Sequence, residues 1–424
     1  MSDGLEGIVP CMHVWYLNHY AGGPGIGKFM RAYHLGCAWV AAGHETTVFV
    51  AQYHHQLESH AGLEPENTIN GVRYVALPAR QYEGNGVGRL LNMADYCFSA
   101  LRLAWRRDID PPDVVIVSSP HPFAVVPAWW LARRHRAKLV FEIRDIWPLS
   151  VVEINGTSAW HPFVIVCGMV ERFAYRVSDL VGSLLAGAHE HIQTMVQTPP
   201  SFVYVPNGTN TGKFVGSKPT STFGAEAFSK IEAWRREGRL IVIHPGAQGA
   251  PNALDRLLNA ISFLKEQGVS EELGVMLVGE GRETSKLKAF ADERALDNVV
   301  FCPTVPYEEA VWLIRHSDVG YAGARDTPSV YRYGISFNKI MDFMQAALPI
   351  ILPINASYNP VSEAQCGVVT GSDRARDIAD AILSLKALTP AQRAEMGERG
   401  RRYAAKIHDY DRIASNYIEA IERA

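Results

Sequence analysis

The sequence alternates short apolar runs with longer amphipathic segments, and this alternation occurs in two separate series. It predicts parallel α/β architecture, because two parallel strands need a crossover connection and a helix usually supplies it. The expected strands of the first series are 13–16, 46–50, 72–76, 114–118, 138–142, 180–183 and 202–205. Those of the second series are 240–244, 274–278, 299–301, 319–321 and 349–352. We therefore expect two doubly wound parallel sheets.

A stretch rich in glycine, proline, serine and threonine, residues 206–223, separates the two series. The chain has 424 residues, so each half is long enough to bury a core of its own. We place the first domain at residues 1–213 and the second at residues 214–405. We expect the C-terminal helix, residues 406–424, to pack back on the first domain.

Charge and cysteine content exclude several classes of protein. The chain has 41 Lys and Arg against 44 Asp and Glu, which disfavours a nucleic-acid binder. Its six cysteines form no C-x-x-C pair, which indicates reduced thiols in the cytoplasm. The N-terminal segment lacks the cationic region of a signal peptide, and no apolar run approaches the roughly 20 residues of a membrane span. We expect a soluble protein that can still contact a membrane.

Residues 22–28, GGPGIGK, lie between the first expected strand and an expected helix at 27–42. Glycines allow a ligand to approach the backbone, and a helix N-terminus favours an anion. The segment fails the dinucleotide fingerprint, because no acidic residue ends the second strand, and it also fails the P-loop pattern. A tight turn between strand and helix is the alternative interpretation.

Two motifs at strand ends carry polar residues in the first series. His121, in SSPHP, is placed to hydrogen-bond a substrate or, alternatively, to cap the next helix. The segment FEIRDIWP contains Glu142, Arg144 and Asp145. Charges at the end of a buried strand are costly unless they pair or bind a ligand. Pairing of Arg144 with Glu142 or Asp145 is therefore the alternative to ligand contact.

The second series contains the richest cluster. HPGAQG and LVGEG end its first two strands, and RDTPSVYRYGISFNK leads into a helix expected at 338–345. Ser336, Asn338, Lys339 and the first backbone amides of that helix predict a diphosphate cradle. Asp342, one turn later, is placed to accept hydrogen bonds from a ribose. The alternative is an i, i+3 pair between Lys339 and Asp342 on a solvated helix face.

A DxD-like pair, Asp108 and Asp110, precedes a strand and therefore lies at the wrong edge of the sheet for a ligand. We interpret it as a solvated turn, and we predict no metal site.

The chain resembles GT-B glycosyltransferases of glycosyltransferase family 4, particularly the bacterial polysaccharide branch. The resemblance covers nearly the whole chain, and its most specific parts are FEIRDIWP, HPGAQG, LVGEG, VPYEEAVWLIRHSDVGYAG and YRYGISFNKIMDFMQAALPII in this order. It implies two Rossmann-like domains that face a central cleft, with the acceptor bound by the first and the nucleotide sugar by the second. It implies retaining transfer from a nucleoside-diphosphate sugar, with UDP favoured, to a sugar or lipid-diphosphate-linked acceptor in surface polysaccharide or glycolipid biosynthesis. No cofactor and no essential metal are implied.

The resemblance also assigns roles to residues. His121, near the donor sugar, and Lys339, at the diphosphate, are the expected catalytic residues. Arg144 and Asp145 are expected on the acceptor side. The expected donor-binding residues are Gly25, Gly27, Gly246, Gln248, Glu280, Lys286, Thr304, Arg332, Ser336, Asn338 and Asp342.

Two departures from the family pattern concern charge. The first of the family's paired glutamates falls at Gly334, and GAQGAPNALDR lacks the usual arginine and lysine. Positive charge at the diphosphate must then come from Lys339 and Arg332, assisted by backbone amides. We expect electrostatic stabilisation of the leaving group and front-face attack. A nucleotide-sugar epimerase on the same fold and a catalytically silent nucleotide-sugar-binding protein are the two alternatives.

The first half also carries a basic and aromatic surface pattern. An expected helix at 89–107 is apolar on one side and ends in arginines, and Arg133, Arg134 and Arg136 follow the pair Trp129–Trp130. Such faces suit an anionic leaflet, so we expect peripheral contact with the inner face of the cell membrane. A core-packed helix with a solvated basic end is the alternative.

Overall fold

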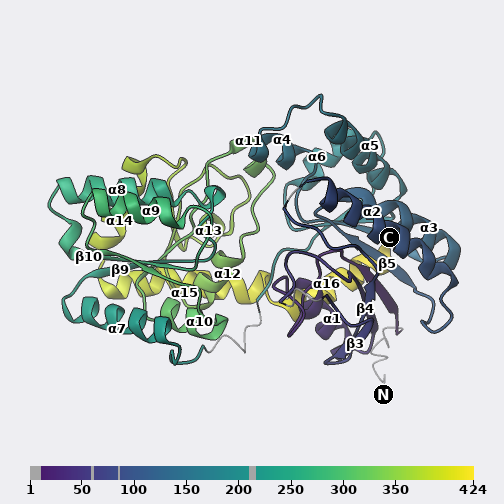
Figure 1. Cartoon of the computed structure of the whole chain (residues 1–424), viewed down its shortest axis with the longest axis horizontal. Helices are drawn as coiled ribbons and strands as arrows, with labels where there is room; N and C mark the ends of the chain where they lie inside the picture. The colour runs from purple at the N-terminus through teal and green to yellow at the C-terminus, as the bar shows by residue number, and fades with distance from the viewer. Residues whose placement is uncertain (1–10, 59–61, 85, 210–215) are drawn as a thin grey trace, which may run out of the picture. The chain divides into compact units, whose positions relative to one another are not determined.

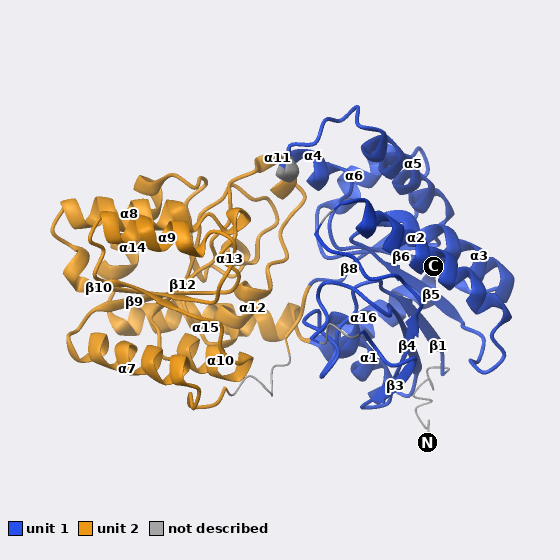
Figure 2. Ribbon diagram, in the orientation of Figure 1, with its two compact units in different colours: residues 1–206, 410–424 blue, residues 207–409 orange. Residues whose placement is uncertain are grey.

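The structure is a computed structural model that describes residues 11–58, 62–84, 86–209 and 216–424. The chain forms two compact units (Figure 2): unit 1 contains residues 1–206 and 410–424, and unit 2 contains residues 207–409. Both units are α/β, with strands and helices in alternation (Figure 1), which confirms the predicted fold class.

Unit 1 is built on an eight-stranded sheet with the order β3-β4-β2-β1-β5-β6-β7-β8. All neighbouring strands are parallel except β3, which pairs antiparallel with β4 at the edge. The connections reverse direction between β1 and β5, and this is the topological switch point. The strands are β1 His13–Leu17, β2 Glu45–Ala51, β3 Glu66–Ile69, β4 Val72–Leu77, β5 Val114–Ser118, β6 Lys138–Ile143, β7 Leu180–Ser183 and β8 Ser201–Tyr204.

Helices cover both faces of this sheet. Helix α1 packs with the C-terminal helix α16, and the Trp39 indole donates to the Ala414 carbonyl at 3.1 Å. Helices α2, α3 and α5 cover the other face and contact one another. The helices are α1 Arg31–Ala41, α2 Val87–Leu101, α3 Val125–His135, α4 Leu149–Asn155, α5 Pro162–Val177, α6 Ala188–Met195 and α16 Tyr410–Arg423, with 3-10 turns η1 Arg102–Trp105 and η2 Pro122–Ala124.

Unit 2 has a six-stranded, all-parallel sheet with the order β11-β10-β9-β12-β13-β14. This is the Rossmann order 3-2-1-4-5-6, and its switch point lies between β9 and β12. Its strands carry continuous apolar runs because both faces are buried. They are β9 Leu240–Pro245, β10 Leu273–Val278, β11 Val299–Cys302, β12 Val319–Tyr321, β13 Ile350–Leu352 and β14 Gly367–Val369.

Two cores flank the unit 2 sheet. Helices α7, α10, α12 and α15 contribute to one core, and α8, α9 and α14 contribute to the other. The helices are α7 Thr222–Arg236, α8 Leu254–Glu266, α9 Thr284–Glu293, α10 Tyr307–Arg315, α11 Pro328–Tyr331, α12 Asn338–Gln345, α13 Pro360–Glu363, α14 Ala375–Ala387 and α15 Pro390–Ile407, with 3-10 turns η3 Ala250–Asn252 and η4 Ser270–Glu272.

Two strands were missed in the sequence, and one helix was placed too early. Strand β3 is mostly exposed and polar, and β14 has only three residues, so neither produces a clear apolar period. Helix α1 begins at Arg31 rather than near Gly27, because the glycine-rich segment folds on itself first. The described residues include no helix long and apolar enough to cross a membrane.

Candidate active site

Lys339 lies at the switch point of unit 2, in the first turn of α12. Its Nζ donates to Asn252 Oδ1 at 2.6 Å, which ties α12 to the loop after β9, and approaches the Gly323 carbonyl after β12 at 3.4 Å. The Lys339 ammonium thus contacts Asn252 and Gly323, and it does not form the ion pair with Asp342 that was the alternative interpretation. Burial lowers the pKa of Lys339 to about 7. A cation that is incompletely solvated in this way gains most from an anionic ligand.

Asp342 lies one turn further along α12. Its Oδ1 accepts a hydrogen bond from the Tyr307 hydroxyl at 2.8 Å, and Tyr307 begins α10. Burial raises the pKa of Asp342 to about 6, although the Tyr307 bond opposes this shift. The carboxylate therefore has one oxygen oriented by Tyr307 and retains further acceptor capacity.

His244, which ends the buried part of β9, bridges the same switch point. Its Nδ1 lies 3.0 Å from the Tyr321 carbonyl on β12, and because a carbonyl only accepts, Nδ1 carries the proton. Burial, reinforced by the Lys339 charge, lowers the pKa of His244 well below its usual value. Its Nε2 is therefore a buried acceptor, and it has no partner within the described parts of the chain.

The loops after β9 and β10 are fastened together. Gly246 N donates to the Val278 carbonyl at 2.8 Å, and the Gln248 side chain donates to the Gly279 carbonyl at 2.6 Å. A Cβ on Gly279 would lie 2.3 Å from the Gly246 carbonyl oxygen, so only glycine permits this approach. Gln248 Oε1 is buried without a partner among the described residues.

The remaining predicted donor residues of unit 2 are less tightly placed. Ser336 is held by Asn207, whose backbone and side-chain nitrogens contact Ser336 Oγ and O at 3.2 and 2.9 Å. Lys286 is exposed on α9, with Glu283 at 3.7 Å, and no contact joins it to Lys339 or Asp342. The other members of this group, all exposed, are Glu280, Thr304, Arg332 and Asn338.

Gly334, where the family's first paired glutamate is expected, has φ +113°. A residue with a Cβ rarely adopts this conformation, so a glutamate there would be strained. The backbone geometry that leads into α12 therefore disfavours a glutamate at this position.

His121 follows β5 at the switch point of unit 1, where it joins a hydrogen-bonded chain. Its Nε2 lies 3.0 Å from His19 Nδ1, and His19 Nε2 lies 2.7 Å from Asn92 Oδ1. His19 follows β1, and Asn92 lies on α2; all three side chains are buried. Burial, with Arg89 nearby, lowers the pKa of His121 to about 3. His121 is therefore a neutral polar group; it occupies the N-cap position of η2, but its side chain makes no capping hydrogen bond.

The glycine-rich segment is a closed turn rather than the start of α1, which corrects the prediction. Gly23 and Gly27 form a small antiparallel bridge, and Gly22 N donates to the Phe29 carbonyl at 2.9 Å. A Cβ on Gly22 would lie 2.3 Å from the Gly27 carbonyl oxygen. Gly25, at the tip, is exposed with φ +71°.

The charged motif at the end of β6 contains one fully buried ion pair and two residues, Arg144 and Asp145, that follow the strand. Glu142 is fully buried and pairs with Arg31 at 2.9 Å, so neither predicted pairing describes it. Arg144 N donates to Ser119 Oγ at 2.8 Å, and its guanidinium covers the Phe29 ring at 4.9 Å. Arg144 Nη1 has no hydrogen-bond partner in the described structure. Asp145 is exposed.

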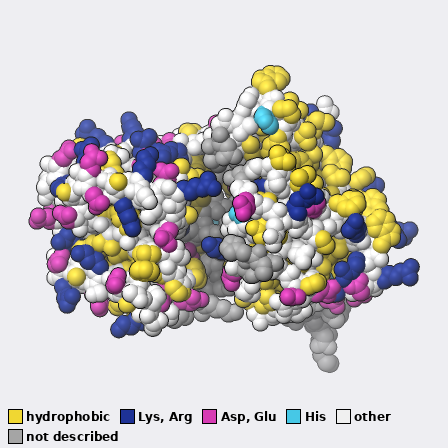
Figure 3. Space-filling view, viewed as in Figure 1, with side chains coloured by type: hydrophobic (Ala, Val, Ile, Leu, Met, Phe, Trp, Pro, Cys, Tyr) yellow, Lys and Arg dark blue, Asp and Glu magenta, His cyan; other side chains and the backbone are white. Residues whose placement is uncertain are grey.

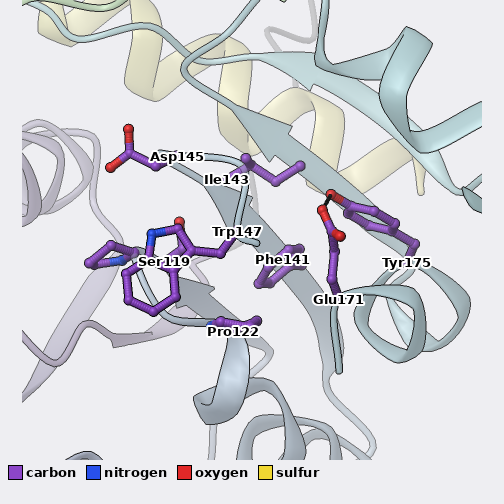
Figure 4. A pocket seen from close by; sticks show the side chains of 9 residues that line it. Ser119, Pro122, Phe141, Ile143, Asp145, Trp147, Glu171 and Tyr175 are labelled. Atoms are coloured by element: carbon purple, nitrogen blue, oxygen red, sulfur yellow. Dashed lines mark hydrogen bonds between the residues drawn. The ribbon is translucent and has the colours of Figure 1, made fainter. Parts of the chain in front are cut away.

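A small pocket lies beside this motif (Figure 4). Asp145 and Trp147 come from the loop after β6, and Ser119 comes from the loop after β5. On the far side, the Tyr175 hydroxyl donates to Glu171 Oε1 at 2.8 Å, and both residues lie on α5. In Figure 4 the Asp145 side chain points away from the Glu171–Tyr175 pair.

Sequence reasoning missed His19 and Asn92, and it quoted His244 and Tyr307 only within HPGAQG and VPYEEAVWLIRHSDVGYAG, without giving either a role. His19 follows β1 and His244 lies at the end of β9, the first strand of each series along the chain, and this position is the signal that could have identified them. Asn92 and Tyr307 lie on helices and carry no local signal. Asp108 is occupied by ion pairs with Arg106 and Arg73, and the described residues contain no group of three or more His, Cys, Asp or Glu that could hold a metal ion.

Two family models match the chain. "Glycosyl transferase 4-like domain" matches residues 27–208, and "Glycosyl transferases group 1" matches residues 239–387. Comparison with curated protein sequences found no match.

Among solved structures, sucrose-phosphate synthase from Thermosynechococcus elongatus is similar at TM-score 0.73 and 16% identity, covering 97% of this chain and 98% of that one. WaaG, a glycosyltransferase involved in lipopolysaccharide biosynthesis, is similar at TM-score 0.66 and 16% identity, covering 96% and 99%. Anabaena HepE in complex with UDP-glucose is similar at TM-score 0.64 and 14% identity, covering 97% and 100%. With two Rossmann-like sheets and these matched domains, the chain belongs to the GT-B glycosyltransferases of the GT4 type.

Proposed function

We propose that this glycosyltransferase moves a sugar, with retention of configuration, from a nucleoside-diphosphate sugar to a lipid-diphosphate-linked or sugar acceptor. The observation that carries the proposal is Lys339, a desolvated ammonium at the switch point of unit 2 beside the start of α12. An anion there gains from the lysine and from the helix dipole together. UDP is the favoured nucleotide, since the related HepE structures hold UDP or UDP-glucose.

The chemistry we propose is electrostatic. As the bond to the diphosphate breaks, negative charge grows on the leaving oxygen, and Lys339 with the first amides of α12 stabilises it. Asp342, oriented by Tyr307, accepts from the ribose hydroxyls. Gly246, Gln248 and the exposed donor residues of unit 2 complete this half of the donor site. No cofactor or metal takes part in this proposal.

Front-face attack is favoured over a double displacement. Glu142 lies opposite Ser118, at the end of the strand that precedes His121, but its carboxylate already accepts hydrogen bonds from Arg31, Tyr16 and Ser118. Burial alone would raise the pKa of Glu142, yet Arg31 and the hydroxyls outweigh it, and the pKa is lowered. A carboxylate stabilised in this way is a poor nucleophile.

We place the acceptor on unit 1, near Arg144 and Asp145. The Arg144 Nη1 atom, buried and without a partner among the described residues, would gain from an anionic group such as a phosphate, and Asp145 and Trp147 lie in the same loop after β6. WaaG, whose fold is similar, is involved in lipopolysaccharide biosynthesis, which supports a role in surface polysaccharide or glycolipid synthesis.

Unit 1 also exposes an apolar face that we propose contacts an anionic membrane from the cytoplasmic side. Hydrophobic side chains gather on this unit in Figure 3. The most exposed are Val87 and Phe98 on α2, Trp105 after it, Trp160 before α5 and Met169 on α5. Arg102 lies over the Phe98 ring at 4.7 Å, so a positive charge lies within the apolar face. Apolar area with interspersed arginines suits an anionic bilayer.

The membrane contact is tested by co-sedimentation with vesicles that do or do not contain anionic lipid. We expect Trp160→Ser with Met169→Ser to reduce binding to anionic vesicles. Phe223→Ser, a change of an equally apolar exposed residue on α7 of unit 2, is the matched control. Equal binding by both variants, or binding independent of anionic lipid, would contradict the membrane contact.

The transfer reaction is tested with a panel of nucleoside diphosphates and their sugars. Thermal stabilisation identifies the donor, and transfer to lipid-diphosphate-linked and free sugars is then followed, with the anomer of the product determined by NMR in the presence of a chelator. Turnover with retention is expected. Donor stabilisation without turnover would favour a silent binding protein, and conversion of the donor sugar to its epimer would favour an epimerase.

A further inference from the structure

The amide of Asn92 is held in one orientation. Its Nδ2 lies 2.6 Å from the Arg80 carbonyl and 3.0 Å from the Tyr53 carbonyl. Both oxygens only accept, so the nitrogen of the amide must face them. Oδ1 therefore faces the opposite direction, toward His19, and acts as an acceptor.

This orientation determines the proton positions on His19. Its Nε2 lies 2.7 Å from Asn92 Oδ1, so Nε2 donates. Burial, reinforced by His121, His54 and Arg89, lowers the pKa of His19 well below its usual value, so the ring carries one proton only. His19 Nδ1 is then an acceptor.

The same logic passes to His121. Its Nε2 lies 3.0 Å from His19 Nδ1, so Nε2 must carry the proton. The low pKa of His121, about 3, leaves the ring neutral and Nδ1 unprotonated. Nδ1 is buried and has no hydrogen-bond partner in the described part of the chain. A buried polar atom left unpaired is unfavourable, so a ligand that donates to it is favoured.

We propose that Asn92 and His19 are positioning residues, which hold His121 in the tautomer that presents Nδ1 as an acceptor for a hydroxyl group of the sugar substrate. The inference rests on the proposed function in one respect only: a hydroxyl group of a sugar is named as the group that donates a hydrogen bond to Nδ1. The chain of hydrogen bonds from Asn92 through His19 to His121, called the relay here, joins the loops after β1 and β5 to α2. It therefore lies at the switch point, where ligands of such sheets bind. In the other tautomer of His121, two unprotonated nitrogens, His121 Nε2 and His19 Nδ1, would face each other and their hydrogen bond would be lost.

The direct test is 15N NMR of the imidazoles in protein labelled at histidine, with the His121 signals identified by their loss in His121→Phe. In the wild-type protein we expect a protonated Nε2 and an unprotonated Nδ1 between pH 6 and 8. Protonation of Nδ1 in that spectrum would overturn the proposal. The measurement needs no activity, so it is independent of the proposed reaction.

The variant His19→Phe keeps an aromatic ring but removes the acceptor for His121. We expect His121 to populate both tautomers, and kcat/KM for transfer to fall about tenfold, within the coupling that contacting residues show. Asn92→Leu should act in the same direction. His19→Phe added to His121→Phe should cause no further loss.

His13→Phe is the matched control, because His13 begins the same strand and contacts Thr47 at the opposite edge of the sheet. We expect its tautomer pattern at His121 and its turnover to equal those of the wild-type protein. An unchanged His121 spectrum in both His19→Phe and Asn92→Leu would overturn the proposal. If no donor is turned over but the spectra behave as expected, the proposed function fails and the relay stands.

Discussion

The two switch points share a topology but differ in charge. In unit 1, the residues that meet between β1 and β5 are two neutral histidines joined to an amide. In unit 2, a lysine with a lowered pKa meets a neutral histidine between β9 and β12. Each site retains a buried histidine nitrogen without a partner among the described residues, His121 Nδ1 and His244 Nε2. The same scaffold therefore provides a neutral site suited to hydroxyls and a cationic site suited to a diphosphate.

The deeply buried charges of unit 1 serve its structure instead. Arg31 donates to Glu142 and to the carbonyls of Val205 and Pro206, so it fastens the start of α1 to the centre of the sheet and to the last segment before unit 2. Breaking a buried pair leaves an uncompensated charge.

The largest effect is expected for Arg31→Met, which leaves Glu142 buried and unpaired. We expect unit 1 to lose about 3–5 kcal/mol of unfolding free energy, measured by denaturant titration. Arg80→Met, which breaks the exposed pair with Asp95, is the control, with a much smaller expected loss because solvent screens that pair. Equal losses in the two variants would show that the Arg31–Glu142 pair is not structural.

Lys339→Met should affect catalysis rather than folding. Removal of a group that stabilises a developing negative charge lowers kcat by about 10²–10³-fold. The control is Lys230→Met, an exposed lysine over the Trp234 ring on α7, which should retain full turnover. A Lys339→Met enzyme with wild-type kcat would remove the functional distinction between the two sites.

The affinity for a nucleotide sugar should pass through a maximum as the pH changes, with one limb that falls at high pH and another that falls at low pH. Lys339 has a pKa of about 7 in the empty site, and a bound diphosphate raises it, so affinity is highest below pH 7 and falls above it, by at most about tenfold per pH unit. Asp342 has a pKa of about 6, so affinity falls again as this carboxylate protonates below pH 6. Calorimetry with UDP-glucose measures both limbs, because its diphosphate is doubly esterified and does not titrate in this range.

The variants assign each limb. Lys339→Met should abolish the high-pH limb, and Asp342→Asn should abolish the low-pH limb. A high-pH limb that persists in Lys339→Met would transfer the titration to another group.

The smallest effect concerns the missing carboxylate. Gly334→Glu and Gly334→Ala should each lose about 1–2 kcal/mol of stability, because both force a Cβ into the φ +113° conformation. Neither should increase transfer. If Gly334→Glu raised kcat above that of Gly334→Ala, the carboxylate would be compatible with this site after all.

The sequence was sufficient for the sheet architecture. Continuous apolar runs identify parallel strands because both faces of such a sheet are buried, and the polar residues directly after those runs point to the ligand edge. Lys339 and Asp342 could be placed in one helix turn from their spacing alone. By contrast, β3 was missed because its exposed, polar residues carry no burial period.

Only the tertiary structure decided the partners. Local periodicity reports which face of an element a residue occupies, but not which distant side chain it meets. Lys339 meets Asn252 across 87 residues of sequence, His121 meets His19 across 102, and Arg31 meets Glu142 across 111. These contacts set the protonation of the groups at both switch points, because desolvation and hydrogen-bond direction depend on the packed surroundings. The chain's pattern thus determined where chemistry can occur, whereas the fold decided which atoms are protonated there.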